Sequence, residues 1–117
     1  MYKPSYFKPS EFKCNGVIVF DNMNDKLLML LDKLRLRINK AIVITSSYRT
    51  KEHNAKVGGY SNSQHLKGLA VDIRCKNSNY RYLVIKEALR LGFVGIGVGS
   101  NFIHLDIRDK REVMWTY

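Results

Sequence analysis

Alternating apolar and polar residues predict two short strands in the second half of the chain. The first covers residues 69–73 and the second covers residues 102–107. Because successive side chains of a strand point to opposite faces, the apolar residues of each strand share one face. Asp72 of the first strand, and His104 and Asp106 of the second, take the opposite face. These strands therefore present polar side chains on a face that does not pack on the core.

Two longer segments have the spacing of amphipathic helices. After Asp25, apolar residues recur three and four positions apart as far as Ile38, with charged residues mostly between them. Asn24 or Asp25 can cap the first turn. The second segment covers residues 80–91 and ends at Gly92, a common helix terminator. Each helix is expected to pack its apolar face on a sheet.

Shorter segments complete the predicted domain. Residues 41–45 are rich in β-branched side chains and predict a buried strand, and residues 50–57 can form one or two helical turns. Residues 93–101 alternate glycine with apolar residues, which is typical of a strand that another backbone or a ligand approaches closely. Two prolines argue against a helix in residues 1–12, where we expect an extended arm lying across the domain.

These elements predict one α+β domain that spans residues 1–117. We expect an antiparallel sheet with helices on one face and a zinc site on the other. A chain of 117 residues can bury a core without disulfides or a structural metal. Cys14 and Cys75 fit no zinc-binding spacing and are expected to be buried free thiols. A bound metal would therefore be functional.

The charge balance favours a polyanionic partner. The chain has 20 Lys and Arg against 10 Asp and Glu, a net charge of +10. Nucleic acid and the anionic bacterial wall both qualify, and a solvated basic surface is the plain alternative because the charges are scattered. The sequence has no helix-turn-helix, RNP or zinc-finger pattern, so no specific nucleic-acid interface is expected.

His65, Asp72 and His104 are the candidate metal ligands. His65 lies in a polar loop shortly before the strand that carries Asp72, and His104 lies on the polar face of the second strand. Two imidazoles and a carboxylate with an open fourth position describe a catalytic zinc site. A lone histidine is more often structural, and His53 in a polar helical turn is interpreted that way.

Four sequence blocks together resemble the zinc peptidases that cleave peptidoglycan stem peptides. The blocks are SSYRT, GGYSNSQH, LKGLAVDI and FIHLDIR. This is the D-Ala-D-Ala carboxypeptidase and L-Ala-D-Glu endopeptidase family of the LAS metallopeptidases, and the similarity extends over about residues 12–115. The family's Ser-x-His pattern, followed after six residues by Asp, matches Ser63, His65 and Asp72, and its later histidine matches His104. The resemblance implies zinc bound by these two histidines and the aspartate.

The resemblance also implies roles for polar residues around the ligands. Arg49 corresponds to the family's arginine in an S-G-Y-R context, with Ser47 in place of the glycine. A guanidinium suits a substrate carboxylate or a developing oxyanion, and a salt bridge is the structural alternative. Ser63 and Gln64 are candidates for binding the substrate or for orienting His65, or they are plain loop residues.

The residue that accepts a proton from water is less well defined. Several relatives carry an acid three residues before the last histidine, where this chain has Asn101, and an amide does not accept that proton. Asp106 is the predicted substitute because it shares a strand face with His104. The alternative for Asp106 is a carboxylate that holds an imidazole or Arg108. Asn101 also leaves open a non-catalytic wall-binding or morphogenesis domain that retains the fold.

The resemblance implies a zinc-dependent peptidase that hydrolyses an amide bond in peptidoglycan peptides, for wall lysis or remodelling. No segment approaches the ~20 apolar residues of a membrane span, and the first residues lack the apolar core of a signal peptide. We expect a monomer without membrane contact, made in the cytoplasm and acting on the wall after release, as phage-encoded lytic enzymes do. Which peptide bond is cleaved stays open, because it depends on loop shapes.

Overall fold

A five-stranded sheet forms the centre of the computed structural model, which describes residues 1–117. Its strand order is β3-β4-β6-β5-β7. Neighbouring strands are antiparallel except β5 and β7, which run parallel. The predicted antiparallel sheet is confirmed, with one parallel pair at its edge. The strands are β3 (Ile44–Ser46), β4 (Ala70–Arg74), β5 (Gly95–Val98), β6 (Phe102–Asp106) and β7 (Val113–Thr116).

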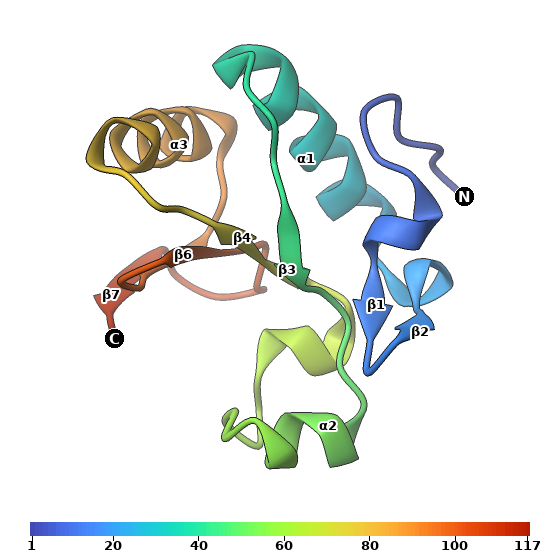
Figure 1. The fold of residues 1–117 in the computed structure, drawn as a ribbon. Coiled ribbons are helices and arrows are strands. Elements are labelled where there is room, and N and C mark those ends of the chain that lie inside the picture. Colours follow the sequence, from blue (N-terminus) through green and yellow to red (C-terminus); the bar gives the residue numbers. More distant parts are fainter.

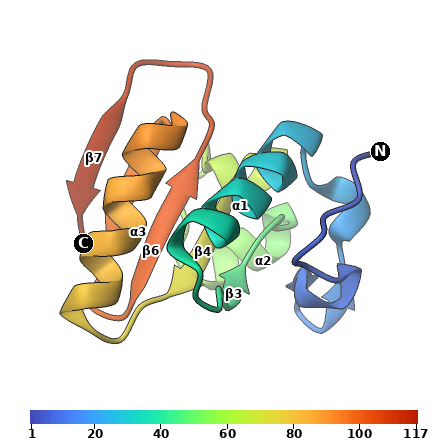
Figure 2. The same cartoon turned by 90° about the horizontal axis from the view of Figure 1, so that it is seen from above.

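Two helices, α1 (Asp25–Ile38) and α3 (Ser78–Leu91), cover one face of the sheet (Figure 1). The Asn24 side chain accepts hydrogen bonds from two backbone N–H groups of the first turn of α1, and the Asn77 side chain accepts one from the Tyr80 N–H of α3. Gly92 ends α3 in the left-handed conformation, as expected for a terminating glycine. Seen from above, α3 lies beside β6 and β7 and α1 lies over β4 (Figure 2).

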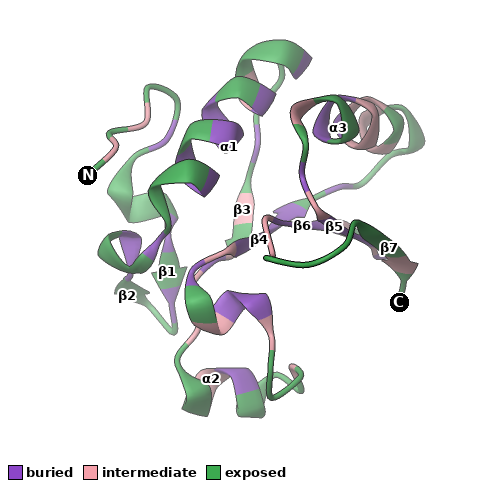
Figure 3. Cartoon of the chain, turned by 180° about the vertical axis from the view of Figure 1, so that it is seen from behind, coloured by how far each residue is buried: buried purple, intermediate pink, exposed green.

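The core lies between these helices and the sheet. It combines the leucines of α1 with the apolar residues of β4 and β6, including Val71, Ile73, Ile103 and Leu105. Figure 3 shows the buried stripe of α1 turned toward the sheet. The opposite face carries α2 (Lys51–Lys56) and the short 3₁₀ helix η3 (Gln64–Lys67). The arrangement predicted from the alternation, with helices on one face and polar side chains on the other, is therefore confirmed.

The amino-terminal segment lies against α1. The hydroxyl of Tyr2 and the backbone N–H groups of Ser5 and Tyr6 donate hydrogen bonds to the Asp32 carboxylate. Part of the expected extended arm is helical instead, because a 3₁₀ turn begins at a proline, a residue suited to a first helical position. The segment contains η1 (Pro9–Glu11), β1 (Lys13–Cys14), β2 (Val17–Ile18) and η2 (Phe20–Asn22).

The buried strand predicted at residues 41–45 is misplaced. The strand β3 begins at Ile44, forms the edge of the sheet and exposes Thr45. A β-branched run suits an edge strand as well as a central one, so composition alone does not separate them. Cys14 and Cys75 are buried free thiols, as predicted. None of the helices has the length and apolar character needed to span a membrane.

Candidate metal centre

Three elements bring His65, Asp72 and His104 together on the face of the sheet opposite α1 and α3. Asp72 on β4 pairs directly with His104 on β6, and η3 carries His65 just before β4 begins. One possible ligand atom from each residue lies within 4.8 Å of the others. The two imidazoles are buried and Asp72 is 8% exposed. The three residues proposed from the sequence as metal ligands therefore converge.

His65 is held by contacts within its own segment. The Ser63 hydroxyl accepts a hydrogen bond from the His65 backbone N–H at 3.2 Å and so caps η3. Gly68 ends η3 in the left-handed conformation, where a Cβ would collide with the backbone carbonyl of Asn22. His65 Nδ1 donates to the Ser47 carbonyl oxygen at 2.8 Å. Its Nε2 lies 3.1 Å from Asp72 Oδ1, and this nitrogen would bind a metal in place of that contact.

His104 is held by a carboxylate. Its Nε2 donates to Asp106 Oδ2 at 2.6 Å, which fixes the ring proton on that nitrogen and leaves Nδ1 facing Asp72. Asp106 is completely buried, and the Arg108 guanidinium donates to both of its oxygens. A carboxylate that orients a ligating imidazole is a common support for a metal site.

The geometry of the three donors fits zinc. His65 Nε2 and His104 Nδ1 each lie 3.1 Å from Asp72 Oδ1. Tetrahedral zinc with bonds near 2.0–2.2 Å separates its donors by about 3.3–3.6 Å, slightly more than these contacts. Two imidazole nitrogens and one carboxylate oxygen are also the donor types that zinc prefers. These residues would hold the ion with little rearrangement.

Electrostatics keep the carboxylates charged. Burial alone would favour the neutral form of Asp72, but hydrogen bonds from His104 and His65 outweigh burial and hold the pKa of Asp72 well below its usual range. Burial likewise opposes the charge of Asp106, and hydrogen bonds from His104 and Arg108 hold its pKa well below the usual range. Both groups are therefore anionic at neutral pH, the form that binds or supports a cation.

A cavity of about 460 Å³ opens over Asp72. Arg49, His53 and Asn101 also line it, and Asp72 is its one acidic residue. Asp72 thus lies in the wall of an open hollow that can admit a substrate, which is a requirement for a catalytic site, whereas His65 and His104 are buried next to Asp72 and do not line the hollow.

A scan against protein families matches residues 5–106 to the family described as Peptidase M15. The chain belongs to the peptidase M15 family. This finding confirms the resemblance seen in the sequence blocks. M15 peptidases are zinc-dependent, so membership supports a metallopeptidase in which His65, Asp72 and His104 form the group that could bind the metal. A comparison with curated proteins returned no match.

In this M15 peptidase, Arg49 contacts a proposed ligand directly. Its Nη2 lies 3.2 Å from Asp72 Oδ2, its Nε donates to Ser46 Oγ at 2.9 Å, and its Nη1 donates to Asn54 Oδ1 at 3.2 Å. Arg49 therefore steadies the Asp72 oxygen that faces away from the imidazoles. It also lines the cavity, and its predicted roles in catalysis and substrate binding stay predictions.

The other predicted site residues take different positions. Asp106 is sealed behind His104 and does not line the cavity, so its contacts favour the supporting alternative, and its assignment as proton acceptor stays a prediction. Asn101, at the position where relatives carry an acid, does line the cavity. Ser63 caps η3, and Gln64 is buried beside it, outside the cavity lining. Substrate binding by Ser63 and Gln64 is likewise untested.

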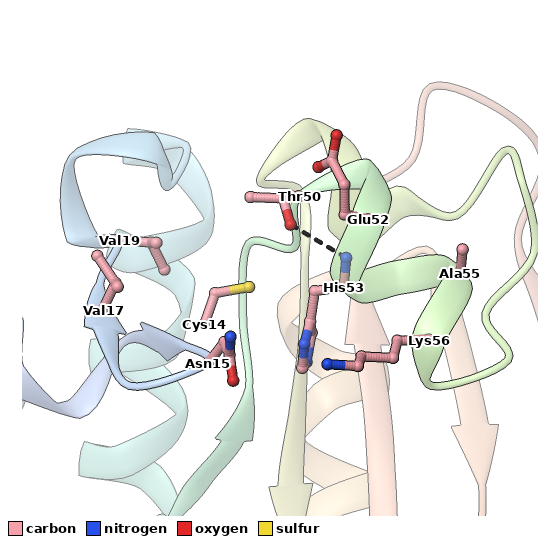
Figure 4. A pocket seen from close by; sticks show the side chains of 9 residues that line it. All are labelled: Cys14, Asn15, Val17, Val19, Thr50, Glu52, His53, Ala55 and Lys56. Atoms are coloured by element: carbon pink, nitrogen blue, oxygen red, sulfur yellow. Dashed lines mark hydrogen bonds between the residues drawn. The ribbon is translucent and has the colours of Figure 1, made fainter.

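A second hollow, of about 670 Å³, lies between the β1–β2 hairpin and α2. Figure 4 shows His53 and Lys56 of α2 beside Asn15 of the hairpin, with the Glu52 carboxylate pointing away from them. This hollow is larger than the one at the metal centre but contains none of the three donors. Because His53 lines both, the two hollows adjoin at that residue.

The alternating glycines of β5 make room for side chains of this site. A Cβ at Gly95 would collide with the Asp106 carboxylate, and one at Gly97 would collide with the Trp115 ring. The predicted close approach is thus made by side chains and not by a backbone. Trp115 of β7 lies with its ring centroid 5.0 Å from that of His104, and the Arg108 guanidinium lies over the Trp115 ring, 5.1 Å from its centroid. Sequence reasoning missed Trp115, although the alternating glycines indicate that large side chains pack against β5.

Proposed function

We propose that this M15 peptidase is a zinc-dependent enzyme that hydrolyses an amide bond in peptidoglycan stem peptides. The observation that carries the proposal is the convergence of His65, Asp72 and His104, of which Asp72 lines an open cavity. Zinc bound there would activate a water molecule and polarise the carbonyl of the scissile bond. The net charge of +10 supports attraction to the anionic bacterial wall.

The surrounding residues orient each donor. The Ser47 carbonyl fixes the tautomer of His65, and Asp106 fixes that of His104. Arg49 binds the outer oxygen of Asp72. Because every donor has a second partner, the set is arranged before a substrate enters, and little reorganisation is needed during the reaction.

One observation favours a second candidate function. Asp72 is the one acid in the cavity lining, and Asn101 occupies the position from which an acid would face the substrate. Without a carboxylate that can accept a proton, the fold could bind wall peptides and zinc without hydrolysing them. We therefore retain a non-catalytic wall-binding domain as the competing function.

Digestion of purified peptidoglycan separates the two functions. The zinc-loaded protein is incubated with walls, with and without a chelator, and the soluble fragments are identified by mass spectrometry. The peptidase is expected to release fragments with new termini, to stop with chelator and to resume when zinc is restored. The position of the new termini identifies the bond. Walls that bind the zinc-loaded protein but stay intact would establish the non-catalytic function instead.

A further inference from the structure

The cavity at the metal centre has a strongly cationic end. Arg74 and Lys76 line it together with Asp72, and Phe102 is one of its two apolar lining residues. Arg74 pairs with Phe102 across β4 and β6, in the same register that pairs Asp72 with His104. The cationic end therefore belongs to the same hollow as Asp72, one of the three proposed zinc ligands.

Strand geometry sets the spacing of these cations from the metal centre. Asp72 and Arg74 are two residues apart and point to the same face of β4, about 7 Å from one another along the strand. Lys76 follows two residues after Arg74, and both are exposed whereas Cys75 between them is buried. An extended peptide advances by about the same amount for each two residues. A peptide whose scissile bond lies at the donors would thus place neighbouring groups at Arg74 and Lys76.

These two cations differ from the other basic residues near the site. Arg49 is ion-paired with Asp72, and Arg108 is ion-paired with Asp106. Arg74 and Lys76 are exposed, and their side chains form no ion pair or hydrogen bond. Their charge is available for a ligand at no cost in broken contacts.

We propose that Arg74 and Lys76 form a subsite that binds a carboxylate of an acidic peptide substrate, next to the bond that is cleaved. This inference rests on the proposed function, since it names the substrate feature that the same cavity recognises. Two unpaired cations, with Phe102 opposite Arg74, suit a carboxylate carried on a short side chain or at a chain end. The subsite favours substrates that keep this carboxylate free over substrates in which it is amidated.

Peptide binding to the full zinc-loaded chain tests the subsite. The probes are acetyl-L-Ala-γ-D-Glu-L-Lys-D-Ala-D-Ala with free carboxylates, the same peptide amidated at the D-Glu α-carboxyl, and the same peptide amidated at its C-terminus. Trp115, the one tryptophan of the chain, lies beside His104 and reports binding by fluorescence without requiring turnover. The double variant Arg74→Gln/Lys76→Gln is compared with Lys33→Gln/Lys40→Gln, which removes the same charge from exposed positions on and just after α1.

The Arg74/Lys76 double variant is expected to bind the fully charged peptide about tenfold more weakly, and the control variant to bind it normally. One of the two amidated peptides should show the same loss with the wild type and no further loss with the double variant, which identifies the carboxylate. Equal binding of all three peptides, or equal losses in both double variants, overturns the subsite.

Hydrolysis assays on the same samples keep the two proposals apart. If hydrolysis does not depend on Arg74, Lys76 or the carboxylates, the proposed subsite is wrong and the proposed peptidase function stands. If binding depends on the carboxylate but no hydrolysis occurs, the proposed subsite stands and the proposed peptidase function is wrong. If the zinc-loaded chain neither binds nor cleaves any of the peptides, both proposals fail.

Discussion

Two arginine–aspartate pairs flank the donor set and are built differently. Arg49 reaches from the loop after β3 to Asp72 on β4, a contact between segments distant in sequence. Arg108 binds Asp106 only two residues away at the end of β6. Asp72 is 8% exposed and lines the cavity, whereas Asp106 has no exposed surface. The first pair presents a carboxylate to the site, and the second seals one behind it.

This difference assigns separate tasks to two chemically identical side chains. Asp72 Oδ1 faces both imidazoles, so a metal can replace those contacts without disturbing the rest of the fold. Asp106 uses both oxygens for Arg108 and for the Nε2–H of His104. Asp106 can accept another proton only by giving up contacts that hold a ligand. We therefore expect Asp72 to bind the metal and Asp106 to position His104.

The largest effect is expected from adding an acid to the cavity. If Asp106 only positions His104, the cavity lacks a side chain that takes a proton from water, and Asn101→Asp supplies one. General-base assistance typically contributes 10²–10⁴-fold, so turnover of wall peptides should rise by about that factor. Steady-state kinetics at saturating zinc measures it, with Asn101→Ala as the matched control. An unchanged rate in Asn101→Asp would show that a proton acceptor is already in place.

Replacing Asp106 tests whether the sealed carboxylate only positions His104. Asp106→Asn removes the charge that orients His104, and outer contacts of this kind typically change metal affinity by about 10–100-fold. We expect the zinc affinity of the variant, measured in competition with a chelator, to fall by that factor. Excess zinc should restore full occupancy of the site. Unchanged zinc affinity with turnover lowered by about 10²–10⁴-fold would instead make Asp106 the proton acceptor.

The two arginines provide a matched test of stability. Arg108→Gln leaves the buried Asp106 carboxylate with fewer donors, and an unsatisfied buried group costs about 1–3 kcal/mol. Arg49→Gln leaves Asp72 with its imidazole partners and some exposure, so its cost should be smaller. Urea unfolding of both variants without metal measures the free energy of unfolding. If Arg49→Gln lowered the free energy of unfolding more than Arg108→Gln, the account would be contradicted, because Asp106 is the carboxylate expected to depend more on its arginine.

The smallest effect concerns acid stability without metal. Folding lowers the pKa of Asp72 and of Asp106, so their stabilisation is present above the unfolded pKa of about 4 and is lost as pH falls toward the folded pKa. Thermal unfolding temperatures should fall steeply below about pH 4 in chelator. Asp106→Asn should flatten this decline because it removes one titrating group. An equally steep decline in that variant would exclude Asp106 as a source of acid sensitivity.

Local rules were sufficient to predict the core of this site. Strand alternation has a period of two, so His104 and Asp106 share a face of β6, and Asp72 takes the face of β4 opposite its apolar residues. The two main helices followed from apolar spacing, although α3 begins earlier than predicted because Asn77 caps it. These features depend on residues close together in the chain, which is why sequence patterns reveal them.

The sequence pattern did not predict the long-range contacts. The strand β7 joins β5 in parallel and brings Trp115 to His104, but its short sequence has no distinctive alternation. The ion pair between Arg49 and Asp72 depends on where the loop after β3 lies relative to β4. Whether an aspartate faces a cavity or is sealed depends on neighbours that only the tertiary structure specifies. The distinction between Asp72 and Asp106 therefore required the structure.

Zinc content tests the central claim most directly. We predict one zinc per chain in the wild type after dialysis, and its loss in His65→Ala, Asp72→Ala and His104→Ala with secondary structure retained by circular dichroism. His53→Ala is the matched control, because His53 lines the same cavity outside the donor set, and it should keep its zinc. A wild type without zinc, or full zinc in any of the three donor variants, would contradict the account.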